Sequence, residues 1–264
     1  MEAEPTGKLI VVVSGRADGA TSVALGLSGV LGAQQRTVLV DLNPDNPEVA
    51  AFLDLGESKT VYHLAYNAQL AAITQRELHD HLQWHDGFAV LPGITDPMQW
   101  QQITPLFMGN LLRVLCSEFQ TVVVDAGRLR RALPAGLTSG TVLWVVAPHP
   151  LGLAAFERAY RAVDDVTHAG VNVQVLLNQV SPRSLADVAT FIPAEYGLPV
   201  LGELPDCPDF WTRAELGHSV RSLSTPVVDR QRAIRSYGEE VFPMRAALEG
   251  LIERLARPTM AARS

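Results

Sequence analysis

Short apolar runs rich in β-branched residues recur along this chain, and stretches with helical periodicity separate them. The expected strands lie near residues 8–14, 37–42, 88–92, 120–125, 141–147, 172–178 and 199–203. These runs are nearly continuous, which is typical of strands that helices cover on both faces. The expected helices lie near residues 21–34, 46–54, 75–83, 104–118, 151–168, 183–195 and 239–256. This alternation predicts an α/β fold with a doubly wound, mostly parallel sheet of seven to eight strands flanked by helices.

We expect residues 1–264 to form a single domain, because no internal repeat, low-complexity tract or linker divides them. A length of 264 residues fits one large α/β domain, and a hydrophobic content of 47% is ample for its core. In a parallel sheet the functional loops lie at the carboxyl ends of the strands. The residues that follow each expected strand are therefore the first candidates for a site.

The first of these loops has the setting of a phosphate-binding loop. A turn with glycine joins an apolar strand to an apolar helix, so backbone N–H groups and a helix N-terminus can point at one anion. The usual pattern is G-x-x-x-x-G-K-[ST]. Here Ser14 stands at the first glycine, Gly19 at the second, Ala20 at the lysine and Thr21 at the hydroxyl residue. A methyl group cannot bridge the β- and γ-phosphates of a nucleotide, so the main catalytic cation is missing.

Lysine content and overall charge limit the ligands that the chain can hold. Lys8 and Lys59 are the only lysines, and neither can be moved into the loop without breaking its spacing. The formal net charge of −7 argues against a domain that holds nucleic acid by bulk charge. Cys116 and Cys207 have no metal-ligand spacing and are interpreted as reduced thiols. The acidic N-terminus is unlike a signal peptide, and the sequence has no apolar run of ~20 residues, so we expect a cytoplasmic protein.

The order of the motifs resembles that of the MinD/ParA group of deviant Walker-type ATPases over nearly the whole chain. The loop of that group reads K-G-G-x-G-K-[ST]-[ST], and Gly15 to Ser22 are the matching residues. The signature lysine falls on Gly15 and is absent too, although Arg16 stands next to it and could reach across a dimer. Asp18 brings a negative charge to the place where a polyphosphate approaches. We expect that charge to disfavour nucleotide.

Two later strands end in aspartates that extend the resemblance. Asp41 matches the first aspartate of the motif V-L-[LV]-[VI]-D-x-D-P, which lies near the metal in this group. Asn43 stands at the second aspartate, which orients the attacking water in active members. Because an amide is no base, this is a second, independent loss. Asp125 ends the apolar run 121–124 and resembles the Walker B carboxylate that holds Mg²⁺ through water.

The adenine half of the pattern is better kept than the phosphate half. Asn178 ends an apolar run and resembles the asparagine that reads the adenine edge in this group. Pro205 and Asp206, followed by residues 214–217, resemble the loop that flanks the purine and the helix after it.

The resemblance implies a vestigial or weak nucleotide site and assigns no catalytic residue. Thr21, Asp41 and Asp125 would hold Mg²⁺ only if a nucleotide binds, so the cofactor is ATP or ADP with Mg²⁺, or none. The alternative interpretation is that the two aspartates cap loop N–H groups and that Thr21 and Ser22 are ordinary first-turn residues. We expect no turnover, or very weak turnover, because charge stabilisation and water positioning are both lost. The candidate nucleotide-binding residues are Gly15, Arg16, Gly19, Ala20, Thr21, Ser22, Asp41, Asn43, Asp125, Asn178 and Pro205.

Within the group, the chain looks most like the TadZ/CpaE-type proteins of Flp/Tad pilus assembly and the related septum-site-determining proteins. Many of these have G-A-S-T or G-T-T-T in place of G-K-T-T, and residues 19–22 read Gly-Ala-Thr-Ser. The resemblance implies a non-catalytic homodimer that binds protein partners and positions a pilus or secretion machine, or the division site. It allows recruitment to the inner face of the membrane or to the cell pole. Two alternatives are a slow ATP-dependent switch that uses Arg16 or a partner's arginine, and a DNA-associated partitioning protein.

The C-terminal residues 239–257 are expected to form a helix with one apolar face. MinD uses an amphipathic C-terminal helix to sit on membranes, which requires a basic polar face. Here Glu249 and Glu253 offset the arginines of that face. We therefore expect the helix to pack on the domain or on a partner, and leave direct membrane contact as the weaker alternative.

Two other clusters have competing interpretations. On a helix, His81 and His85 would be one turn apart, as in a two-histidine metal site, but no third ligand has matching spacing, which favours a solvated face. Arg128, Arg130 and Arg131 follow the Walker B-like strand and could contact DNA phosphates. In an acidic chain, a solvated or partner-facing turn is the better interpretation of these three arginines.

Overall fold

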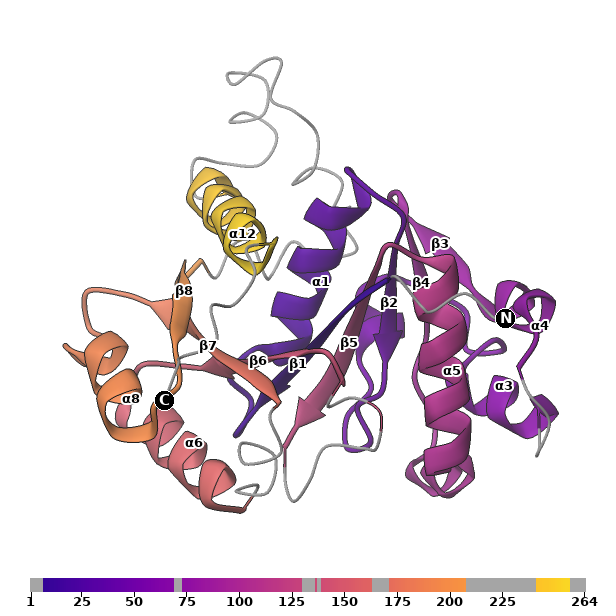
Figure 1. Cartoon of the computed structure of the whole chain (residues 1–264), viewed down its shortest axis with the longest axis horizontal. Helices are drawn as coiled ribbons and strands as arrows, with labels where there is room; N and C mark the ends of the chain where they lie inside the picture. The colour runs from indigo at the N-terminus through magenta and orange to yellow at the C-terminus, as the bar shows by residue number, and fades with distance from the viewer. Residues whose placement is uncertain are drawn as a thin grey trace.

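The computed structural model describes residues 7–68, 73–129, 136, 139–162, 171–207 and 241–256. An eight-stranded sheet with the strand order β3-β4-β2-β5-β1-β6-β7-β8 forms its centre (Figure 1). Every neighbouring pair is parallel except β3 and β4. The predicted α/β class and mostly parallel sheet are confirmed. The strands are β1 (Lys8–Ser14), β2 (Thr37–Asp41), β3 (Gln83–His85), β4 (Phe88–Leu91), β5 (Thr121–Arg128), β6 (Thr141–Val146), β7 (Asn172–Val180) and β8 (Val200–Pro205).

Helices flank this sheet, as the sequence predicts (Figure 1). The helix expected near residues 151–168 is described only as far as Ala162, and the one expected near 183–195 begins at Val188. The short helices α2, α3 and η1 follow β2 and β4 along the chain, and the last two were not expected. The helices are α1 (Ala20–Gly32), α2 (Val49–Phe52), α3 (Val61–Ala68), α4 (Gln75–His81), the 3₁₀ helix η1 (Pro97–Gln102), α5 (Pro105–Glu118), α6 (Pro150–Ala162), α8 (Val188–Tyr196) and α12 (Val241–Ala256).

The central strand β1 shows why the strands are continuous apolar runs. Ile10 and Val12 pack into one core cluster with residues of α1 and α12. Leu9, Val11 and Val13 pack into the other cluster, with residues of α5, α6 and α8. Since successive side chains of a strand point to opposite faces, two layers of helices require an apolar residue at every position.

The antiparallel edge strand β3 corrects one sequence expectation. The helix expected near residues 75–83 ends at His81, because residues 83–85 pair with β4 instead. His81 and His85 therefore do not share a helix face. Within the described ranges, no group of three His, Cys, Asp or Glu residues is arranged to hold a metal ion.

The C-terminal helix α12 lies beside α1 and β8 (Figure 1). Met244, Leu248, Leu251 and Leu255 are buried there, so the described part of the apolar face packs on the sheet layer rather than facing outwards. Lys8 Nζ, at the start of β1, donates a hydrogen bond to the Leu255 carbonyl oxygen. Among the described residues, no helix combines the length and the apolarity that a bilayer crossing requires. The assignment of the whole chain to one domain stays a prediction.

Candidate functional site

A cavity of about 490 Å³ lies at the carboxyl-end edge of the sheet, above the loop that joins β1 to α1. Its wall also includes Asp45 and Glu48 from the segment after β2, and Arg128 and Gln179 from the carboxyl ends of β5 and β7. The sequence-predicted residues Gly15, Asp41, Asp125, Asn178 and Pro205 do not line it. The predicted residues that do line it are Arg16, Gly19, Ala20, Thr21, Ser22 and Asn43.

The loop reaches α1 through a conformation that only glycine adopts without strain. Gly19 has φ 90°, and an added Cβ would lie 2.5 Å from Asn178 Nδ2. Helix α1 begins at the next residue, Ala20, whose side chain is only 5% exposed. The turn geometry of a phosphate-binding loop is therefore present, and a small buried methyl group occupies the position of the lysine.

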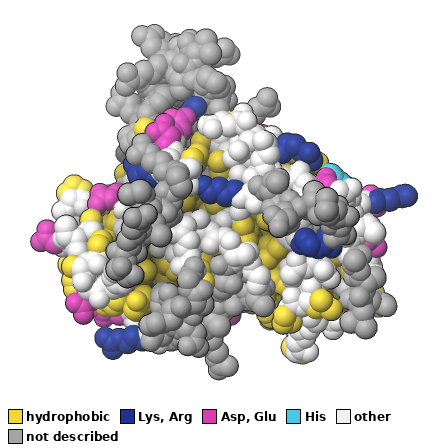
Figure 2. All heavy atoms as spheres, in the orientation of Figure 1, with side chains coloured by type: hydrophobic (Ala, Val, Ile, Leu, Met, Phe, Trp, Pro, Cys, Tyr) yellow, Lys and Arg dark blue, Asp and Glu magenta, His cyan; other side chains and the backbone are white. Residues whose placement is uncertain are grey.

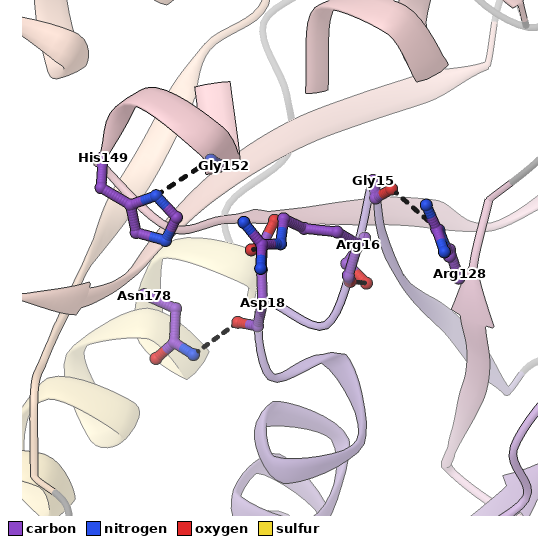
Figure 3. Close-up of polar contacts among 8 residues, drawn as sticks. Gly15, Arg16, Asp18, Arg128, His149, Gly152 and Asn178 are labelled. Carbon is purple, nitrogen blue, oxygen red and sulfur yellow. Dashed lines mark hydrogen bonds and ion pairs between the residues drawn. The ribbon is translucent and has the colours of Figure 1, made fainter. Parts of the chain in front are cut away.

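Asp18 is buried in the loop rather than directed into the cavity. Its side chain is 2% exposed, and Oδ1 lies 3.8 Å from Arg16 Nε. Burial raises the pKa of this carboxyl, while Arg16, His149, the Ala147 N–H and Arg128 partly offset the increase. Figure 3 shows Arg16 and His149 on the side of the loop where Asp18 lies. Asp18 does not line the cavity, and Arg16 lies between its buried carboxylate and the solvent, so the expectation that this charge disfavours nucleotide stays a prediction.

Two residues near this loop were not among the predicted nucleotide-site residues, although the sequence marked Arg128 as a candidate for contact with DNA or a partner. Arg128 at the end of β5 donates from Nε to the Gly15 carbonyl oxygen at 3.2 Å and lines the cavity (Figure 3). His149 precedes α6, and its Nδ1 accepts a hydrogen bond from the Gly152 N–H at 3.0 Å. Arg128 follows a Walker B-like strand, which was a usable signal. His149 follows the strand expected near residues 141–147, which was a signal too, but only the packing of β6 beside β1 shows which loop it approaches.

Asp41 and Asp125 lie side by side as register partners of β2 and β5. Their side chains are 1% and 0% exposed. Burial raises the pKa of Asp41 well above its usual range, and the negative charge of Asp125 adds to this shift. Burial likewise raises the pKa of Asp125 to about 6, although the hydrogen-bonding groups of Thr21 and Gly127 lower it in part. The strand ends therefore hold two carboxyls that resist simultaneous ionisation.

The hydrogen bonds of Asp41 and Asp125 show whether their carboxyl oxygens are free to bind a magnesium ion. Asp41 Oδ1 accepts from the Asn43 N–H at 3.1 Å, and Oδ2 accepts from the Val49 N–H at 3.2 Å. Asp125 Oδ1 accepts from the Gly127 N–H at 3.0 Å, while its Oδ2 is buried without a hydrogen-bond partner. One aspartate is thus already satisfied by its own loop. The described residues offer Mg²⁺ no ready-made ligand set, and the magnesium site stays a prediction.

Asn43 holds its own loop together. Its Nδ2 donates to the Asn46 carbonyl oxygen at 2.7 Å, and its Oδ1 accepts from the N–H groups of Asp45 and Asn46 at 3.1 and 3.2 Å. The side chain also lies against Gly127, where an added Cβ would be 2.2 Å from Asn43 Cγ. The amide therefore acts as the structural centre of the turn after β2.

The adenine half of the predicted site is only partly described. Asn178 is fully buried, and its Nδ2 donates to the Asp18 carbonyl oxygen at 2.8 Å (Figure 3). Pro205 ends β8 beside Val180. Residues 214–217 lie outside the described residues. Asn178 thus hydrogen-bonds to the loop after β1, and its recognition of the adenine edge stays a prediction.

The solved structures that resemble this chain identify its architecture. A ParA family ATPase from Chlorobium tepidum TLS matches with a TM-score of 0.75 at 13% sequence identity, over 95% of this chain and 98% of the other. The chain has a MinD/ParA-like fold. MinD from Pyrococcus horikoshii OT3, complexed with Mg-ADP, matches with a TM-score of 0.69 at 18% identity, over 95% and 96% of the two chains. A chain of the MinC:MinD cell division complex from Aquifex aeolicus matches with a TM-score of 0.66 at 16% identity, over 98% and 99%.

The sequence itself is far from known families. No protein-family model and no curated protein matches it. At the identities of the structural neighbours, the MinD/ParA-like fold is shown, whereas the TadZ/CpaE-type subgroup is not distinguished. In Figure 2, the charged side chains of the described residues are scattered over the visible face. Arg130 and Arg131 lie outside the described residues, so nothing there adds to the DNA-partitioning alternative.

Proposed function

We propose that this chain is a non-catalytic adaptor with a MinD/ParA-like fold, which localises or assembles a pilus or secretion machine or marks the division site. The observation that carries the proposal is the absence of lysine from the cavity wall. Ala20 takes the place of the lysine in the loop, and neither Lys8 nor Lys59 lines the cavity. Lys8 lies at the opposite end of β1 and is bonded to α12.

The bonding of Asn43 supports the same proposal. A catalytic water requires an acceptor that is free to orient it, whereas Asn43 Oδ1 already accepts two backbone N–H bonds. Charge stabilisation and water positioning are the main sources of rate in phosphoryl transfer. A chain that lacks both functions is expected to serve through binding rather than turnover.

The partner class is proposed from the fold and from the loop sequence. One structural neighbour is part of a MinC:MinD cell division complex, which supports a protein partner for this chain as well. The Gly-Ala-Thr-Ser sequence of residues 19–22 supports the TadZ/CpaE-type branch of the group. We extend the proposal to a homodimer located in the cytoplasm and recruited to the membrane face or to the pole.

ATP hydrolysis by the purified chain tests the proposal. We expect the wild type and Thr21→Ala to release phosphate at the same background rate. Ala20→Lys should gain little, because Asn43 and Asp18 remain. A wild-type rate well above background that Thr21→Ala abolishes would overturn the non-catalytic proposal.

A slow ATP-dependent switch is the second candidate, and the cavity itself favours it. A volume of about 490 Å³ with Arg16 and Arg128 in its wall remains open above the loop, and pockets of ~300–1,000 Å³ commonly hold small ligands. Calorimetric titration with ATP and ADP, with and without Mg²⁺, separates the candidates. Magnesium-dependent binding in the micromolar range that Arg16→Ala abolishes would support the switch. Absence of heat at high protein concentration would leave the adaptor without a nucleotide cofactor.

A further inference from the structure

The ion pair between Arg16 and Asp18 bears on which ligands the loop after β1 excludes. We propose that Asp18 is an internal counter-ion that occupies Arg16, so that the loop is closed to polyphosphate ligands by its own carboxylate. This inference rests on the proposed function, because it explains how a phosphate-binding loop remains folded without a phosphate. It assigns Asp18 the role of a specificity-determining residue.

The backbone fixes Asp18 in this position. Its N–H donates to the Arg16 carbonyl oxygen at 2.8 Å, and its carbonyl oxygen accepts from Asn178 Nδ2 at 2.8 Å. The carboxylate is 2% exposed and Arg16 is 37% exposed, so the anion is held inside and the cation lies between it and the solvent. Asp18 cannot withdraw from Arg16 unless the loop rearranges.

The charges around the cavity show what this pairing does to a ligand. The wall carries Arg16 and Arg128 together with Asp45 and Glu48, so its formal charges balance. The Asp18 carboxylate behind Arg16 tips the balance to negative. A pyrophosphate group carries several negative charges and gains from a site only when preorganised positive charge faces it. With Asp18 ionised, the described wall offers no such excess.

Removing the Asp18 charge without changing its shape should therefore release Arg16. The experiment measures the affinity of the full chain for inorganic pyrophosphate by calorimetry, without metal. The variants are Asp18→Asn, the double variant Asp18→Asn with Arg16→Ala, and Arg16→Ala alone. Asp45→Asn is the matched control, because it removes one negative charge from an exposed position of the same wall.

We expect Asp18→Asn to bind pyrophosphate at least about tenfold more tightly than the wild type, because a buried charge is poorly screened. Asp45→Asn should gain less than about threefold, since water and salt screen an exposed charge. The double variant should return to within about threefold of the wild type. Arg16→Ala alone should bind pyrophosphate no more tightly than the wild type, because it leaves the Asp18 charge without its counter-ion. If the wild type gives no measurable heat, the affinities of the variants are compared with the weakest affinity that the calorimeter can detect.

Three results would overturn the proposal. One is an Asp18→Asn affinity that equals the wild-type value, and another is a gain that survives in the double variant. The third is a tenfold gain in Arg16→Ala, which needs no change at Asp18 and thus keeps the test valid if Asp18→Asn unfolds. Pyrophosphate binding involves no hydrolysis, so this test can fail while the chain is still non-catalytic. Turnover of ATP would refute the proposed function without deciding this inference.

Discussion

The two ends of strand β1 have different surroundings, with apolar packing at the amino end and buried carboxyls at the carboxyl end. At the amino end, Lys8 bonds to the last turn of α12, and the helix above it buries apolar side chains such as Leu248. At the carboxyl end, the chain enters a loop that buries Asp18, and the carboxyls of Asp41 and Asp125 are buried at the end of β2 and within β5. Apolar packing stabilises a fold, whereas buried carboxyls cost stability unless they are fully bonded. The amino end therefore secures the fold, and the carboxyl end tolerates an unfavourable arrangement next to the cavity.

Hydrogen bonding is also incomplete at the carboxyl end of β1. Asp18 Oδ2, Asp125 Oδ2 and Asn178 Oδ1 are buried at the carboxyl edge without a hydrogen-bond partner among the described residues. A buried polar group without a partner typically costs ~1–3 kcal/mol. We expect the loss of apolar packing at the amino end to lower stability and the loss of a buried charge at the carboxyl end to raise it, and four predictions test this contrast.

Leu248→Ala should have the largest effect. Leu248 is fully buried, and an added Cβ on Gly26 of α1 would lie only 3.0 Å from Leu248 Cδ1. Truncation leaves a cavity between two helices that the close packing cannot fill, so the free energy of unfolding should fall by ~2–5 kcal/mol. Urea unfolding measures the change. Glu253→Ala, at an exposed position of the same helix, should stay within ~0.5 kcal/mol. Equal effects of the two variants would mean that α12 does not support the fold.

Asp125→Asn should stabilise the chain at neutral pH. The folded pKa of Asp125 is about 6, above the ordinary 3.8. The folded state therefore binds more protons than the unfolded state between these values, and stability falls as pH rises through this window. The amide removes that penalty, so the free energy of unfolding at pH 7.5 should rise by ~1–3 kcal/mol.

The pH dependence provides the control for Asp125→Asn. The gain over the wild type should shrink as the pH falls towards 4, because the wild-type carboxyl is then protonated in the folded state and the window between the two pKa values has been crossed. Urea unfolding at several pH values measures this. A variant that is less stable than the wild type at pH 7.5 would show that the Asp125 charge is needed for the fold.

Asn43→Ala should destabilise the carboxyl edge moderately. The substitution removes three hydrogen bonds that hold the turn after β2, so a loss of ~1–2 kcal/mol is expected. Asn67→Ala, at an exposed position of α3, is the control and should stay within ~0.5 kcal/mol. Thermal unfolding measures both variants. If Asn43→Ala has no effect, the amide is free for a ligand and the structural interpretation fails.

Lys8→Met should have the smallest effect. It removes the hydrogen bond to the Leu255 carbonyl oxygen but keeps an apolar stem of similar length, so a loss of ~0.5–1.5 kcal/mol is expected. Lys59→Met, at an exposed position, should be neutral. Urea unfolding of the pair decides whether the bond contributes, because both variants remove one lysine charge. A loss in Lys59→Met equal to that in Lys8→Met would assign the effect to charge alone.

Local patterns predicted most of the fold. The seven expected strands are present because buried parallel strands require the continuous apolar runs that residues such as Ile10 and Val11 provide. The strand β3 was not predicted, since Trp84 lies on an edge strand and is 64% exposed, which leaves no apolar alternation to detect. The η1 helix was missed because all of its residues are at least partly exposed, so packing gives it no periodic signature.

The sequence by itself determined seven of the eight strands, the position of the loop after β1 and the loss of the lysine at Ala20, because each depends on residues close together in the chain. Only the tertiary structure decided which residues bond to the polar groups of the loop after β1. Asp18 is buried beside Arg16, Asn178 donates to its backbone, and Arg128 bonds to Gly15. These contacts join β1 to β5 and β7 across the sheet. Strand order, rather than local sequence, thus determined which charges lie next to the cavity.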